Sequence, residues 1–267
     1  MADTITRPPV TLATVAGQVA AAEWQARLDG AACYRLVAHY GMSDLVYNHI
    51  TVRVPGTPDA GGEERLLINP FGWLYEEITA SSLITIDLAG NELLNPHRDI
   101  GINPAGYVIH SAVHAARRDV GCVIHTHTRA GMAVSAMRSG LLPLTQTAMR
   151  CLPVAYHDYE GPAVDPAERA RLVADLGSAT CMILRNHGLL TAAPTVAEAF
   201  NAMYWLEMAC RAQVDAMAAR TELLLPPENV IAHAAHLYRP ETRRRFGLLE
   251  WPAMLRLLDR RDPSWRD

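Results

Sequence analysis

Apolar positions along this chain follow two spacings, one typical of helices and the other typical of strands. Between residues 13 and 41 they recur mostly every three or four residues, which predicts a helix that ends near Gly41. Further helices are predicted at 104–117, 129–138, 166–176 and from Thr195 to beyond Gln213. Short runs rich in β-branched or other apolar residues predict strands at 45–54, 66–69, 83–87, 122–127 and 181–184.

The predicted strands and helices alternate without a break in composition, which indicates an α/β fold. The sequence has no internal repeat, no low-complexity segment and no linker. We therefore expect one domain over residues 1–220, followed by a helical extension over residues 221–267. No GxGxxG motif follows a predicted strand, so a dinucleotide site of the Rossmann type is not expected.

The overall composition is that of an ordinary globular protein. The chain is 50% hydrophobic and 19% charged, with a formal net charge of -4, so it lacks the basic field that would gather nucleic acid. Its apolar stretches are shorter than the roughly 18 residues of a membrane span. Residues 1–12 contain no apolar signal core. We expect a cytoplasmic protein with neither a nucleic-acid nor a membrane partner. The five cysteines are scattered, which favours buried thiols.

The sequence contains no lysine, so all 24 basic residues are arginine. A Schiff-base enzyme needs a lysine amine as its nucleophile, and this chain cannot supply one. If the protein performs carbonyl chemistry, the substrate must be polarised in another way. A metal ion is the obvious substitute.

Three of the eleven histidines are candidate metal ligands. His125 and His127 are two residues apart in a predicted strand, so their side chains leave the same face. His187 ends another apolar strand and precedes a glycine. Three protein ligands leave coordination positions open, as in catalytic sites. His-Thr-His is also compatible with a polar surface strand. His110 and His114 share a helix face, either as a second metal pair or, as we favour, as packed and hydrogen-bonded neighbours of the first site.

The chain resembles the class II aldolase/adducin head-domain family, in particular its bacterial adducin-like branch. The matching stretches are Val123–His127, Leu184–Leu190, Asn48–Arg53 and Ile68–Gly72. The similarity extends from about residue 25 to residue 217, within the predicted first domain. The combination of HxH and NHG in this order is specific.

This resemblance implies an α/β/α sandwich around a mixed, mainly antiparallel sheet. It also implies a homotetramer with sites at the subunit interfaces, and a small-molecule carbonyl substrate. His125, His127 and His187 would hold one divalent metal ion per subunit, with Zn(II) favoured over Fe(II), Mn(II) or Co(II). In the family's aldolases the metal binds substrate oxygens and stabilises an enediolate, which agrees with the missing lysine.

Two departures from the family pattern bear on the substrate. The family's aldolases carry an acidic residue four positions before the histidine that matches His110, and this chain has Gly106 there. They also hold a substrate phosphate with small hydroxyl residues, where this chain has Pro104 and Ala105. A non-phosphorylated hydroxy-carbonyl compound or keto acid is therefore the expected substrate.

Other residues are candidates for the remaining roles in the site. For proton transfer the candidates are Tyr159, Glu160 and Glu77, although Glu77 also suits a helix start. The matching motifs suggest that Asn48, Asn69 and Gly72 bind substrate. Arg185, and with it Arg53, could hold a substrate carboxylate through paired hydrogen bonds, or could be surface side chains.

Three functions are compatible with these features. The first is a metal-dependent carbon–carbon lyase of the aldolase or decarboxylase type. The second uses the same three histidines to hold Fe(II) in an oxygenase that acts on an aryl keto acid, because imidazole binds zinc and iron alike. The third is a non-catalytic assembly module of the adducin type, whose head lacks a working metal site, and the intact histidine set argues against it.

Overall fold

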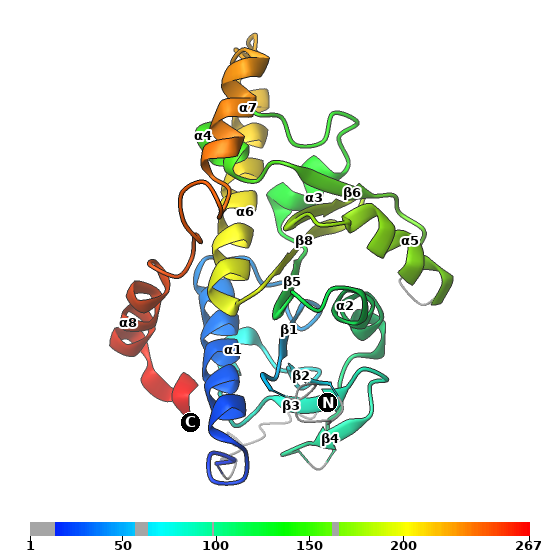
Figure 1. Ribbon diagram of the computed structural model, residues 1–267, viewed down its shortest axis with the longest axis vertical. Helices are drawn as coiled ribbons and strands as arrows, with labels where there is room; N and C mark the ends of the chain where they lie inside the picture. Colours follow the sequence, from blue (N-terminus) through cyan, green and yellow to red (C-terminus); the bar gives the residue numbers. More distant parts are fainter. Residues whose placement is uncertain (1–13, 57–63, 98, 162–165) are drawn as a thin grey trace, which may run out of the picture.

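A computed structural model describes residues 14–56, 64–97, 99–161 and 166–267. It contains one mixed sheet of eight strands in the order β4-β3-β2-β1-β5-β8-β7-β6 (Figure 1). All neighbouring strands pair antiparallel except β6 and β7, which are parallel. The strands are β1 (His49–Arg53), β2 (Arg65–Ile68), β3 (Ile84–Asp87), β4 (Glu92–Leu94), β5 (Cys122–Thr126), β6 (Val154–His157), β7 (Cys181–Leu184) and β8 (Gly188–Ala193).

Helices cover both faces of this sheet (Figure 1). One face carries α1 (Ala21–His39) and α6 (Val196–Ala218), and the opposite face carries α2 (Pro104–Ala116) and α5 (Pro166–Leu176). The remaining helices are α3 (Arg129–Ser135), α4 (Gln146–Arg150), α7 (Glu228–Leu237), α8 (Trp251–Arg261) and the short 3-10 turns η1 (Tyr75–Glu77) and η2 (Pro263–Arg266). The predicted α/β/α sandwich around a mainly antiparallel sheet is therefore confirmed.

Strand β5 shows why both faces of the sheet are buried. Cys122 and Ile124 belong to the core under α1 and α6, whereas Val123 belongs to the core under α2 and α5. Because successive side chains of a strand point to opposite faces, His125 lies on the α2 side together with Val123. The candidate site is thus built on the α2 face of the sheet.

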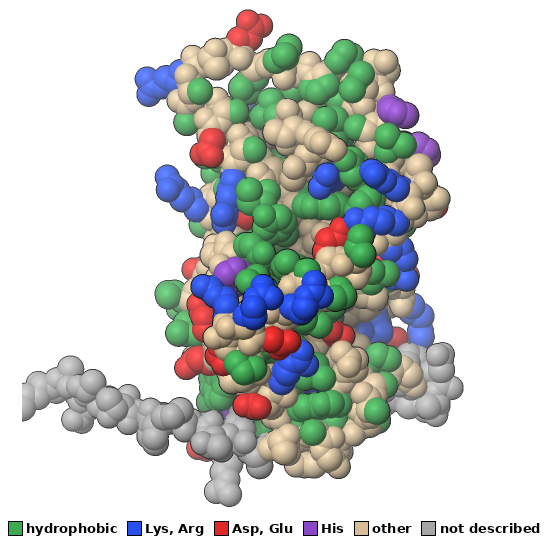
Figure 2. Space-filling view, turned by 90° about the vertical axis from the view of Figure 1, so that its left-hand side faces the viewer, with side chains coloured by type: hydrophobic (Ala, Val, Ile, Leu, Met, Phe, Trp, Pro, Cys, Tyr) green, Lys and Arg blue, Asp and Glu red, His purple; other side chains and the backbone are tan. Residues whose placement is uncertain are grey.

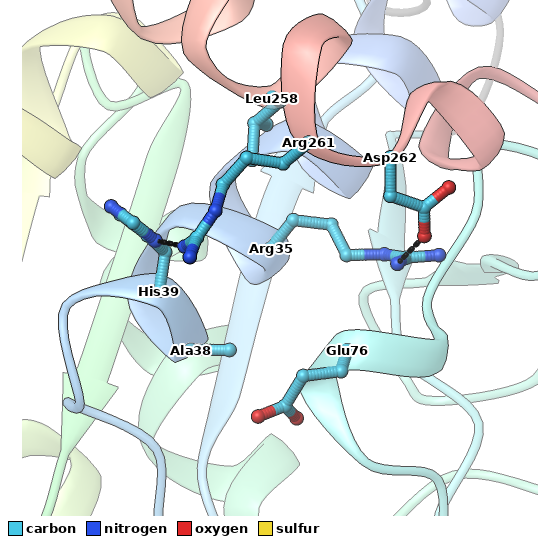
Figure 3. Close-up of a pocket in the computed structure, with 7 residues that line it drawn as sticks. All are labelled: Arg35, Ala38, His39, Glu76, Leu258, Arg261 and Asp262. Carbon is cyan, nitrogen blue, oxygen red and sulfur yellow. Dashed lines mark hydrogen bonds and ion pairs between the residues drawn. The ribbon is translucent and has the colours of Figure 1, made fainter.

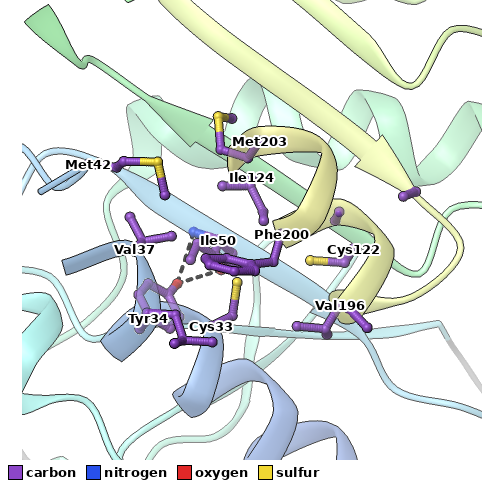
Figure 4. Close-up of a cluster of buried hydrophobic side chains, with 14 of the residues drawn as sticks. Cys33, Tyr34, Val37, Met42, Ile50, Cys122, Ile124, Val196, Phe200 and Met203 are labelled. Carbon is purple, nitrogen blue, oxygen red and sulfur yellow. Dashed lines mark hydrogen bonds between the residues drawn. The ribbon is translucent and has the colours of Figure 1, made fainter. Parts of the chain in front are cut away.

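The hydroxyl of Tyr34 joins α1 to the sheet inside the larger core (Figure 4). It accepts hydrogen bonds from the backbone amides of Ile50 at 3.0 Å and Asn69 at 3.1 Å. A buried hydroxyl that satisfies backbone groups on two strands fixes the position of both. Tyr34 therefore holds the beginning of β1 and the residue after β2 in place against α1.

Several element boundaries differ from the predicted ones. Helix α1 begins at Ala21 rather than near residue 13, which itself lies outside the described residues. The predicted strand 45–54 is shorter, because Leu45 has φ +47° in a turn closed by the Tyr47 amide on the Asp44 carbonyl. Strands β4, β6 and β8 and helix α4 have no counterpart among the predicted elements, and all four are short segments without a clear period.

The segment after α6 returns to the main core. Trp251, Leu258 and Trp265 are buried in the same cluster as α1, and the indole N–H of Trp251 donates to Asp29 at 2.9 Å. Arginines of this segment alternate with carboxylates on the face seen in Figure 2, as in the ion pair of Arg266 with Asp259. The predicted division at residue 220 stays a prediction, although the packing ties the extension to α1.

In the described part of the chain, no helix has the length and apolar character needed to cross a membrane.

Truncation of Trp265 tests whether the C-terminal segment is part of one cooperative unit. Trp265 is 1% exposed, and removal of a buried tryptophan side chain typically costs about 3–5 kcal/mol. We expect Trp265→Ala to lower the free energy of unfolding by that amount in urea denaturation. Leu249→Ala, at a residue 73% exposed, should change it by less than about 0.5 kcal/mol. Equal effects of the two substitutions would contradict this prediction.

Candidate metal centre

Three imidazole rings converge on one point at the edge of the sheet. The Nε2 atoms of His125 and His127 are 2.8 Å apart, those of His127 and His187 are 2.9 Å apart, and those of His125 and His187 are 3.3 Å apart. Tetrahedral zinc with bonds of about 2.0–2.1 Å places its nitrogens roughly 3.3 Å from one another. Among the described residues, these three form the one cluster of metal-ligating side chains that could share an ion.

Local backbone geometry brings the third histidine to the other two. His125 lies in β5 and His127 follows its last residue, while His187 lies in the turn between β7 and β8. Asn186 supports this turn with φ +56°, a conformation that asparagine tolerates better than most residues. A Cβ atom on Gly188 would lie 2.4 Å from the Thr126 carbonyl oxygen. Glycine at this position therefore permits the close approach of the turn to β5.

Hydrogen bonds on the opposite side of two rings fix which nitrogen faces the centre. Nδ1–H of His125 donates to the Leu189 carbonyl at 2.9 Å, and Nδ1–H of His127 donates to the Asp44 carboxylate at 3.0 Å. Each Nε2 then presents a lone pair toward the other rings, as a metal ligand must. The donor set and its outer hydrogen bonds fit a divalent ion with an imidazole preference.

Burial favours the neutral form of two of the rings, His125 and His187. Burial, followed by the neighbouring His187 and His127, holds the pKa of His125 well below its usual value. Burial and His127 lower the pKa of His187 to about 4. Neutral imidazole is the form that binds a metal. Both rings are therefore ready to act as ligands at neutral pH.

Comparison with known sequences shows the family to which this chain belongs. The sequence model described as "Class II Aldolase and Adducin N-terminal domain" matches residues 29–214. The chain belongs to this family. A Pseudomonas aeruginosa protein, whose name assigns it provisionally to aldolase class 2, is 49% identical over 95% of this chain and 96% of its own length. Mouse alpha-adducin is 40% identical over 86% of this chain, but the match covers 32% of adducin.

Solved structures agree with the family assignment. An aldolase II superfamily protein from Pseudomonas syringae has 45% identity and a TM-score of 0.87, with 95% of this chain and 99% of that chain covered. L-fuculose 1-phosphate aldolase from Glaciozyma antarctica has 26% identity and a TM-score of 0.79, with 98% and 97% covered. These class II aldolase neighbours support a lyase-like enzyme.

His110 and His114 are packed and hydrogen-bonded, as favoured from the sequence. Both are fully buried on α2, and the Thr51 hydroxyl lies 2.8 Å from a ring nitrogen of each. Burial lowers the pKa of both, that of His114 to about 3. Gly106, where the family's aldolases carry an acidic residue, lies in the same helix.

The three candidates for proton transfer occupy different surroundings. Tyr159 is half exposed, and its ring centroid lies 6.2 Å from that of His187. Glu160 forms an ion pair with Arg171, which lowers the pKa of its carboxyl group. Glu77 accepts a hydrogen bond from the Leu74 amide at 2.7 Å, in the capping arrangement of a helix start. Tyr159 alone of these three is seen in contact with a candidate ligand, and the catalytic roles stay predictions.

The proposed substrate-binding residues are likewise spread over different environments. Asn48 is fully buried, and neither its amide nitrogen nor its oxygen has a hydrogen-bond partner. Asn69 is already engaged through the Tyr34 hydroxyl at 2.9 Å, and Gly72 has φ +92° in an exposed turn.

Arg185 and Arg53 are both engaged with protein groups. The Arg185 guanidinium donates to the Met137 carbonyl at 2.8 Å and stacks over Tyr156. Arg53 donates to the His114 carbonyl at 2.7 Å and forms an ion pair with Glu64. Their roles in substrate binding stay predictions.

The sequence did not reveal three side chains near the centre. Asp44, which orients His127, follows α1 in a turn with no recognisable signal. His49 belongs to the Asn48–Arg53 motif and is 5% exposed beside His125. The polar segment around His157, which could have been a solvated loop, instead buries that ring against Asp175, with 2.7 Å between Nδ1 and the carboxylate.

A separate hollow lies between α1, η1 and α8 (Figure 3). The side chains that line it are those of Arg35, Ala38, His39, Glu76, Leu258, Arg261 and Asp262. Four of these side chains are already engaged with one another, because Arg35 binds Asp262 at 3.0 Å and Arg261 contacts His39. We therefore assign the chemistry to the three-histidine centre.

The buried histidines predict how stability depends on pH. The pKa of His114 is lowered in the folded state from an unfolded value of about 6.5. Its contribution to stability is therefore complete above pH 6.5 and is lost as the pH falls toward 3. Between pH 6.5 and 5, the free energy of unfolding of the metal-free protein, measured in urea, should fall by up to about 1.4 kcal/mol per pH unit for each such histidine. This slope reports the number of protons taken up on unfolding, and His114→Gln should reduce that number by about one. The exposed His233→Gln should leave it unchanged.

Asp44 should strengthen metal binding through His127. Loss of a carboxylate behind a ligating histidine typically weakens metal affinity about 10- to 100-fold. We expect Asp44→Asn to weaken Zn(II) or Co(II) binding to this extent in competition titrations, without a change in the far-ultraviolet circular dichroism spectrum. Asp215→Asn, on α6, is the matched control. An unchanged affinity in Asp44→Asn would contradict the role of this hydrogen bond.

Proposed function

We propose that the protein is a divalent-metal-dependent carbon–carbon lyase, of the aldolase or decarboxylase type, acting on a small non-phosphorylated hydroxy- or keto-carbonyl compound. The observation that carries this proposal is the convergence of three Nε2 atoms within 3.3 Å. Family membership and the absence of lysine support the same conclusion. Lysine would be required for the metal-free Schiff-base route to aldol chemistry.

The roles of the residues follow from their positions. His125, His127 and His187 would hold the ion, for which we propose Zn(II). When bound, such an ion acts as a Lewis acid that draws electron density from a substrate oxygen. Tyr159, half exposed beside His187, would donate or accept a proton, and its position beside a candidate ligand supports this role. Gly106 and Ala105 lack the side chains that the family's aldolases use for acid–base chemistry and phosphate binding, which favours a non-phosphorylated substrate.

We propose that the protein forms a homotetramer and that each site lies at a contact between subunits, where the neighbouring subunit completes it. Large apolar side chains are exposed on the segments that carry the site: Leu45 is 68% exposed and Tyr47 52% exposed, both next to Asp44. Met132, on the helix after His127, is also exposed. Clustered exposed apolar groups of this kind commonly mark protein interfaces.

Metal analysis and a substrate panel test the proposal together. Protein purified without added metal should contain about one divalent ion per chain, as a site of this ligand set binds one ion. His125→Ala, His127→Ala and His187→Ala should each lose it, while the exposed His236→Ala should keep it. The wild type should then cleave a hydroxy-keto acid or a hydroxyketone with Zn(II) present and dioxygen excluded, and prefer it to the phosphorylated counterpart. Normal metal content in all three variants would overturn the ligand assignment.

The same assay separates two other functions. Activity that requires Fe(II) and consumes dioxygen would identify an oxygenase on the same histidines. Similarity to alpha-adducin favours an assembly module as the second candidate, and a wild type that binds no metal and turns over no substrate would support it.

A further inference from the structure

His49 lies directly beside the three-histidine centre. Strands β1 and β5 pair antiparallel with His49 opposite His125, so both rings project from the α2 face of the sheet. Their ring centroids are 6.1 Å apart. His49 is too far from the common point of the other three rings to share their ion. It therefore lies next to the ion position, where a substrate attached to the ion would be.

The ring that packs on His49 has a polar atom that the protein leaves unpaired. Nε2 of His110, whose ring packs at 5.3 Å and 72° against that of His49, lacks a hydrogen-bond partner. A buried polar group without a hydrogen bond is costly, so this atom indicates a position for a polar ligand.

The Thr51 hydroxyl connects the buried ring of His110 to that of His114. It lies 2.8 Å from Nδ1 of His110 and 2.8 Å from Nε2 of His114. A hydroxyl has one hydrogen, so it donates to one of these nitrogens and accepts from the other.

The two rings therefore share one protonation pattern. Burial favours the neutral form of both, which carries one proton per ring. When Nε2–H of His114 donates to Thr51, Nδ1 of His110 accepts and both rings carry the proton on Nε2; in the reverse direction both carry it on Nδ1. Thr51 thus couples to His114 the state of Nε2 of His110, the atom left without a partner in the ring that packs on His49.

We propose that His49 contacts the substrate beside the three-histidine centre, and that Thr51, His110 and His114 are positioning residues that hold it there in one hydrogen-bonding state. The proposal rests on the proposed function for the ligand that His49 meets. The ligand class is a small molecule with two adjacent oxygen donors, one of them facing His49.

The positioning line is tested in the metal-free full-length protein by nitrogen-15 NMR of the histidine rings. Wild type should show His110 and His114 protonated at the same ring nitrogen, Nδ1 in both or Nε2 in both. Thr51→Val removes the hydroxyl at constant shape and should change the protonated nitrogen of at least one ring, whereas Thr51→Ser keeps the hydroxyl and should keep the wild-type pattern. Protonation of the two rings at different nitrogens in the wild type would overturn the positioning role of Thr51.

The contact is tested with acetohydroxamate, a bidentate oxygen ligand, and the Co(II)-loaded protein, whose visible spectrum reports binding. His49→Phe should bind Co(II) like the wild type but bind acetohydroxamate roughly tenfold more weakly, since one hydrogen bond is lost. His49→Asn and His49→Gln place an amide near the positions that Nδ1 and Nε2 of the His49 ring occupy in the wild type. One of these two variants should restore most of the affinity for acetohydroxamate. His233→Gln is the control away from the site.

The outcomes separate this proposal from the proposed function. A wild type that binds no Co(II) overturns the proposed function and the His49 contact with it, while the NMR result still decides the positioning line. Co(II) binding with equal acetohydroxamate affinity in wild type and His49→Phe overturns the contact alone. Weaker Co(II) binding in His49→Phe would instead identify His49 as a metal ligand, and would also overturn the proposed substrate contact.

Discussion

The structure around the candidate centre depends on one constraint: three imidazole Nε2 atoms, two of which direct lone pairs inward, are held within 3.3 Å of one another. Such lone pairs repel unless a cation or a proton lies between them. Burial opposes the proton, because it lowers the pKa of His125 and His187. The hydrogen bonds to Leu189 and Asp44 hold the rings in this arrangement. The fold thus maintains a site whose repulsion a divalent ion relieves.

The sheet supplies the rigidity that this arrangement needs. His125 lies in β5, a central strand that is buried on both faces, and the turn bearing His187 joins β7 to β8, the strand that pairs with β5. Gly188 allows that turn to approach the Thr126 carbonyl, so a larger residue would push His187 away from the centre. Because His127 and His187 lie directly beside the ends of these paired strands, the strand pairing limits how far the three ligands can move apart.

Most of the sheet and the three candidate ligands could be predicted from the sequence because they depend on local patterns. The run 181–184 coincides with β7, and the spacing of His125 and His127 identified the pair. Asp44 could not be found in this way, since its carboxylate reaches His127 through a turn 83 residues away in the chain. The position of His49 beside His125 depends on the register of β1 against β5, which the sequence pattern of β1 alone does not determine. The sequence showed that Gly106 stands where the family's aldolases carry an acidic residue, but it did not show which side chains surround that position.

The relation between catalysis and assembly in this family can be argued from the same residues. A scaffold needs the sheet and its two helical layers, for which the cores on both faces suffice. It has no need of two imidazoles with Nδ1 hydrogen bonds that direct bare Nε2 atoms at each other, nor of a buried asparagine amide without a partner. Each of these features costs stability, roughly 1–3 kcal/mol for every unsatisfied buried polar group. A chain that retains these features, and links Thr51, His110 and His114 by hydrogen bonds beside the centre, carries an arrangement that ligand binding explains better than assembly does.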